Sequence, residues 1–104
     1  MLSLSNTEQI ALNFLMEEWE LSSHEREWFL VVNSRKIPES WWSIVEIGLK
    51  DLPDKWVIQV YDDGECDPCY TFVSPFSNQN LTAHLAHLPE KIAIALEAER
   101  KGYI

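Results

Sequence analysis

Hydrophobic residues near the N-terminus recur at the spacing of an amphipathic helix. The apolar positions that would share one helix face are Ile10, Ala11, Phe14, Leu15 and Trp19. Glutamates at 17, 18 and 20 would face solvent. The preceding Ser5-Asn6-Thr7-Glu8 matches a capping box with Ser5 as the N-cap. The pattern therefore predicts a helix over residues 6–20.

The middle of the chain is richer in β-branched and aromatic residues and is interrupted by turns. The predicted strands span residues 27–33, 41–49, 56–61 and 70–73. Ser22-Ser23-His24-Glu25 could cap a second helix, but the apolar run that follows favours a strand. Turn-forming residues lie at 36–40, 51–55 and 62–64. This close spacing predicts an antiparallel meander.

The C-terminal third returns to a helical pattern. Asn78 or Asn80 could cap a helix that holds Leu81, Leu85 and Leu88, and residues 90–101 form a second helical run before Gly102. We therefore expect one α+β domain over residues 1–104. It has an N-terminal helix, a three- to four-stranded antiparallel meander, and a C-terminal helix or helix pair packed on one face.

The charge balance narrows the classes of partner. Eight Lys and Arg against seventeen Asp and Glu give a net charge of −9. The element order resembles that of double-stranded RNA-binding domains, cystatin-like domains and small NTF2-like domains, without a shared motif. Nucleic-acid binding needs a basic surface, so we expect no direct binding to DNA or RNA. The acidic surplus fits solubility, attraction to a basic protein partner, or mimicry of a polyanion.

Two features bear on cellular location. No apolar run approaches the length of a membrane span, and residues 1–16 lack the pattern of a secretory signal. Two cysteines in a domain of this size fit a reducing compartment. We therefore expect a cytoplasmic protein with no membrane association.

Five tryptophans, all in the first half of the chain, exceed the usual frequency. Trp19, Trp28 and Trp56 are expected in the core. Trp41 and Trp42 are neighbours on a predicted strand and would point to opposite faces, so one of them is expected to be exposed as a binding anchor.

One segment concentrates the candidate chemistry. Both cysteines lie within residues 62–69, and His84 and His87 follow. Cys66-x2-Cys69 and His84-x2-His87 resemble a four-ligand zinc site in number, although the spacings differ from those of a common zinc finger. Alternative interpretations of this segment, a redox thiol pair or a calcium loop, fit less well, because acids surround the thiols and the register of a calcium loop is absent.

No nucleophile–base set and no glycine-rich phosphate loop is present. We therefore expect a non-catalytic protein-interaction module, such as an inhibitor, immunity protein, adaptor or accessory subunit, without a cofactor. Its partner would be another protein with a basic surface. The sequence is also compatible with a homodimer. The predicted contact residues are Asp62, Asp63, Glu65, Asp67, Trp41 and Trp42. The alternatives are a zinc-binding structural or regulatory domain and a small enzyme of unknown substrate.

Overall fold

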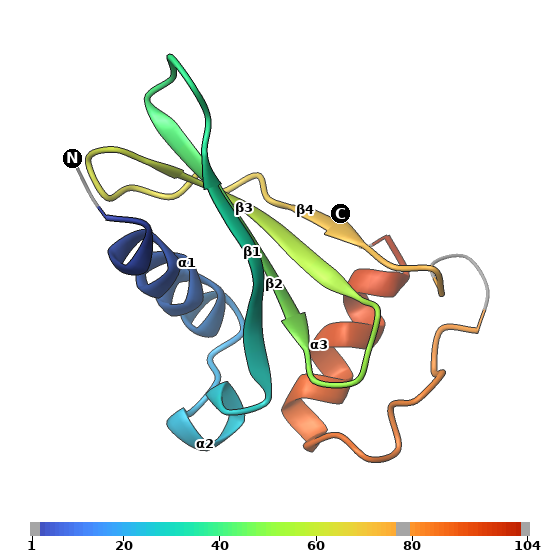
Figure 1. Cartoon of the computed structure of the whole chain (residues 1–104). Coiled ribbons are helices and arrows are strands. Elements are labelled where there is room, and N and C mark those ends of the chain that lie inside the picture. The colour runs from blue at the N-terminus through green and yellow to red at the C-terminus, as the bar shows by residue number, and fades with distance from the viewer. Residues whose placement is uncertain (1–2, 77–79, 103–104) are drawn as a thin grey trace.

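The computed structural model describes residues 3–76 and 80–102 and has the predicted α+β arrangement (Figure 1). Its elements are α1 (Leu4–Glu18), α2 (Ser23–Arg26), β1 (Phe29–Lys36), β2 (Trp42–Leu49), β3 (Lys55–Tyr61), β4 (Thr71–Val73) and α3 (Glu90–Arg100). Within the described ranges, no helix is long and apolar enough to cross a membrane.

The four strands form one antiparallel sheet in the order β1-β2-β3-β4. The predicted meander is therefore confirmed. The β1–β2 register shifts between Val31 and Asn33, which is a local bulge in an otherwise regular ladder. The β2–β3 ladder runs without a shift from Trp42 opposite Tyr61 to Gly48 opposite Lys55.

Side-chain alternation gives the sheet one buried face. On β2 the inward residues include Val45, Ile47 and Leu49, and on β3 they are Trp56, Ile58 and Val60. These side chains form one apolar cluster with Ala11 and Leu15 of α1 and with Ile92 and Leu96 of α3. Both long helices therefore pack on the same face of the sheet, as the period-2 and period-3.6 patterns require.

The helix starts near the N-terminus differ from the predicted ones. Ser3, not Ser5, is the N-cap of α1, and its hydroxyl accepts from the Asn6 N–H at 3.1 Å. The capping box occurs instead at Ser22 and Glu25, where it begins α2. The short α2 displaces the predicted strand, so that β1 begins at Phe29 rather than at residue 27.

The predicted helix that would hold Leu81, Leu85 and Leu88 is wrong. Residues 81–87 form turns, and His84 has a positive φ of 63° that an α-helix does not allow. The Arg100 guanidinium donates to the Leu81 and Ala83 carbonyls at 3.0 and 2.7 Å, so these oxygens have a partner outside any local helix. Asn78, one of the two predicted caps, lies outside the described residues.

Candidate functional site

The predicted partner-binding residues lie together at one end of the sheet. Trp41 directly precedes β2, and its carbonyl accepts from the Asp62 N–H at 2.7 Å. Trp42 pairs with Tyr61 across the β2–β3 ladder, and their rings meet edge to face, with centroids 6.4 Å apart at an interplanar angle of 80°. We call Trp41, Trp42 and residues 61–67 the tip.

The two adjacent tryptophans have different environments, as alternation predicted. Trp41 is 77% exposed, more than any other large hydrophobic residue described as exposed, whereas Trp42 is half-buried against Tyr61. A tryptophan side chain carries a large apolar area and one N–H donor, a combination common in interaction hot spots. Trp41 is therefore the exposed member of the pair, which the sequence left open.

The four carboxylates of the tip fall into two groups. Asp62 forms an ion pair with Lys36, at 2.8 and 2.9 Å from Nζ, and Asp67 accepts from the Tyr61 hydroxyl at 3.1 Å. The Asp67 carboxylate raises the pKa of Tyr61. Asp63 and Glu65 are exposed and have no ion pair with a described residue. The charge that a partner could use therefore lies mainly on these two acids.

The cysteines and histidines of the predicted zinc set occupy different surroundings. Cys66 forms an isolated antiparallel β-bridge with Val60 through its backbone. Burial, the main cause, and the nearby Glu65 carboxylate, the second, raise the pKa of the Cys66 thiol to about 11. Cys69 is exposed. His84 and His87 line a cavity of about 300 Å³ together with Trp28, Lys50 and other residues of that region. In the parts of the chain that the structure describes, no three His, Cys, Asp or Glu side chains could hold one metal ion. The arrangement gives no support to the zinc alternative.

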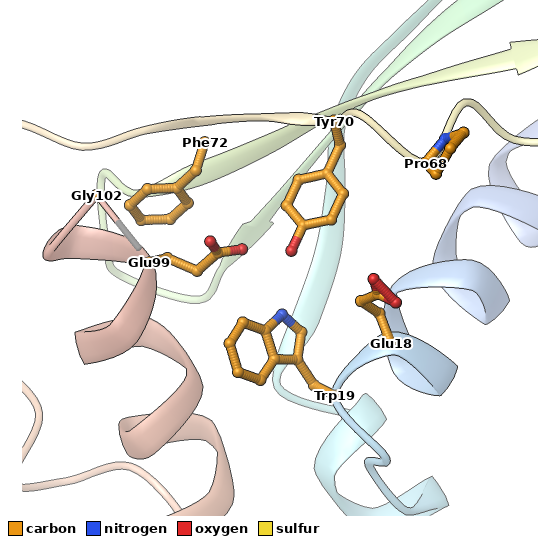
Figure 2. Close-up of a pocket in the computed structure, with 7 residues that line it drawn as sticks. All are labelled: Glu18, Trp19, Pro68, Tyr70, Phe72, Glu99 and Gly102. Carbon is orange, nitrogen blue, oxygen red and sulfur yellow. The ribbon is translucent and has the colours of Figure 1, made fainter. Parts of the chain in front are cut away.

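A larger cavity, of about 620 Å³, escaped the sequence reasoning (Figure 2). It lies between the C-terminal ends of α1 and α3, beside β4 and the segment that leads into it. Its lining residues are Glu18, Trp19, Pro68, Tyr70, Phe72, Glu99 and Gly102. We call it the Glu18–Glu99 cavity. In the sequence, the one hint of this cavity is the neighbouring pair Glu18-Trp19, because the helical pattern places Glu18 toward solvent and Trp19 toward the core.

Comparisons of the chain with protein-family models, with curated proteins and with solved structures gave no match. Function is therefore inferred from the geometry of the tip and of the Glu18–Glu99 cavity.

Proposed function

We propose that the protein is a non-catalytic protein-interaction module that uses the tip to bind a partner with a basic surface. The observation that carries this proposal is the exposure of Trp41, 77% of whose surface is open to solvent, in the same tip as Asp63 and Glu65, which form no ion pair with a described residue. The partner would receive the indole in an apolar pocket and place basic side chains against the two acids. This division matches interfaces in which an aromatic anchor supplies affinity and a charged rim supplies specificity.

The structure makes some tip variants more informative than others. Charge reversal at Asp62 or Asp67 would also remove the contact with Lys36 or Tyr61, so a weaker affinity could come from local unfolding. Asp63 is exposed, and among the described residues its carboxylate accepts one hydrogen bond, from the Glu65 N–H at 3.0 Å. Asp63→Lys is therefore the cleaner test of the electrostatic part.

The experiment begins with affinity capture by the immobilised wild type and by Trp41→Ala from a lysate of cells that produce the protein. A protein retained by the wild type and lost with the variant is then purified, and its dissociation constant is measured by calorimetry. We expect Trp41→Ala to weaken binding by about 30-fold or more, the size of a hot-spot loss of about 2 kcal/mol. Asp63→Lys should slow association and reduce its salt dependence.

Leu30→Ala provides a matched control, because Leu30 is an exposed apolar residue of β1, outside the tip. It should leave the affinity within about twofold. Equal retention of every protein by the wild type and Trp41→Ala would contradict the proposal. Concentration-dependent self-association that Trp41→Ala abolishes would instead identify the partner as a second copy of this chain.

The two thiols are compatible with a cytoplasmic location for this module. Cys66 and Cys69 are both free rather than joined in a disulfide. Free thiols persist in reducing compartments. Detection of the protein in the cytoplasmic fraction of its own cells would test this part of the proposal.

A further inference from the structure

We propose that the Glu18–Glu99 cavity binds an organic cation, an ammonium or guanidinium group attached to a short chain that carries a hydrogen-bond acceptor. The cavity volume of about 620 Å³ is within the range of small-ligand sites. This site is separate from the tip, and the inference does not depend on the proposed function.

The charge of the cavity is the first reason. Glu18 and Glu99 both line it, and neither forms a salt bridge with any residue that the structure describes. Glu18 ends α1 and Glu99 is in the last turn of α3, so two helix C-termini add their partial negative charge at the same place. A cation is therefore the ligand charge that this environment favours.

The position of Glu99 is fixed by the core. The buried Trp56 donates from Nε1 to Glu99 Oε2 at 2.6 Å, and the Trp56 ring packs against Phe72 with centroids 5.2 Å apart. Figure 2 shows the Glu99 carboxylate between Phe72 and Tyr70, where it faces the cavity. Burial, followed by the Glu99 and Glu18 carboxylates, raises the pKa of Tyr70 well above its ordinary range, so its hydroxyl stays neutral. The hydrogen bond from Trp56 therefore holds the Glu99 carboxylate in place before any ligand binds.

The walls favour an organic cation over a metal ion. Trp19, Tyr70 and Phe72 present aromatic surface to the cavity, and aromatic faces attract ammonium and guanidinium groups. The two carboxylates alone do not make a metal site, and among described residues no third His, Cys, Asp or Glu completes one. Aromatic walls around carboxylates are the chemistry that recognises alkylammonium groups and arginine.

The indole of Trp19 adds a requirement for an acceptor. Its Nε1 atom is buried, points toward the Tyr70 hydroxyl (Figure 2) and forms no hydrogen bond of good geometry in the described part of the protein. Buried donors in native proteins nearly always have a partner. Because this atom is covered, a ligand oxygen next to the cationic group would reach it after a small displacement of the Tyr70 hydroxyl, and would then satisfy the N–H.

The test is a titration of ¹⁵N-labelled protein, followed through the Trp19 indole N–H resonance, which is assigned with a Trp19→Phe variant. Two cations are compared with their neutral isosteres at constant ionic strength: choline with 3,3-dimethylbutan-1-ol, and N-acetylarginine amide with N-acetylcitrulline amide. We expect saturable shifts with a cation and none with its neutral isostere. Tetramethylammonium, which lacks the acceptor, should bind more weakly than choline.

Carboxylate variants locate the binding. Glu18→Gln and Glu99→Gln should each weaken the cation by roughly fivefold, whereas Glu17→Gln, one position from Glu18 but outside the cavity, should change it less than about twofold. Saturation by choline alone indicates a small free ligand, and saturation by the arginine amide alone indicates a side chain of another protein. Shifts that are equal for cation and isostere, or an equal effect of Glu17→Gln and Glu18→Gln, would overturn the inference. Trp41→Ala should leave the titration unchanged, which separates this site from the tip.

Discussion

The buried ion pair between Arg100 and Asp54 provides a demanding test of the fold. Both side chains are completely inaccessible, and the guanidinium donates to the two carboxylate oxygens at 2.8 and 3.0 Å. It also donates to the Leu81 and Ala83 carbonyls and lies over the Phe76 ring, 4.7 Å from its centroid. One side chain thus joins α3, the residue before β3 and the turns that precede α3.

Replacing Arg100 by Met removes the positive charge and leaves a buried carboxylate without a counter-ion. Breaking a buried pair in this way costs about 3–5 kcal/mol, and each of the two lost bonds to a carbonyl adds about 1 kcal/mol. Domains of this size have total stabilities of about 5–15 kcal/mol. Arg100→Met should therefore be folded only marginally, with a loss of about 5–7 kcal/mol in the free energy of unfolding.

The double variant Arg100→Met/Asp54→Leu separates the two causes. It removes the stranded carboxylate and leaves only the two unsatisfied carbonyls, so it should be more stable than Arg100→Met alone and lie about 1–3 kcal/mol below the wild type. Urea unfolding, followed by tryptophan fluorescence and by circular dichroism, measures each value. Lys101→Met is the control, because its exposed pair with Glu97 should contribute less than about 1 kcal/mol. A double variant as unstable as Arg100→Met would refute this reasoning.

Three further predictions rest on single residues. Cys69 should react quickly with a disulfide reagent at pH 8 and Cys66 slowly, because Cys69 is exposed whereas burial raises the pKa of the Cys66 thiol to about 11. The variant Cys69→Ser keeps only the slow thiol, and stopped-flow absorbance measures its reaction rate. A fast reaction of that variant would contradict the prediction. Because the pKa of Tyr70 is raised in the folded protein, the unfolded chain releases the phenolic proton first, so the stability should fall as the pH rises above about 10. The melting temperature of Tyr70→Phe should depend much less on pH in this range than that of the wild type. An equal pH dependence in the two proteins would argue against this reasoning. Glu39 is exposed and has a φ of 60°, in the left-handed region that glycine adopts more readily than other residues. Glu39→Gly should therefore raise the free energy of unfolding in urea titrations by about 0.5–1 kcal/mol. A loss of stability would show that the Glu39 side chain contributes to the fold.

The sheet could be predicted because its pattern is local. Ser43, Val45 and Ile47 are buried and alternate with the partly accessible Trp42, Ile44 and Glu46, and this alternation determines which side of β2 faces the helices. The false helix over Leu81–Leu88 shows the limit of such reasoning. Its leucines have helical spacing, but the turns there satisfy their carbonyls through Arg100, a contact that no local pattern contains.

The two candidate sites also differ in how far a local sequence pattern could predict them. The tip comes from one short acidic segment and the adjacent Trp41-Trp42, so its residues could be predicted together. Which tryptophan is exposed depends on where the core ends, and that required the structure. The Glu18–Glu99 cavity combines residues from three distant parts of the chain, and its negative character comes from two helix ends that meet only in the folded protein.

The acidic surplus of the chain can be separated into structural and available charge. Asp54 and Asp62 have cationic partners, and Glu46 pairs with both Arg35 and Lys55. The other acids of the tip, Asp63, Glu65 and Asp67, and the two acids of the cavity, Glu18 and Glu99, have no such partner among the described residues.

If the net charge of −9 served solubility alone, removing any one exposed carboxylate would have the same small effect on cation binding. A built site makes the effect depend on position, because an anion held against aromatic walls acts at short range whereas a solvated one is screened. Glu17→Gln and Glu18→Gln differ by one position and make the same change in charge. A difference between them in choline affinity, at unchanged stability, would therefore show that the charge at this end of α1 is placed for binding.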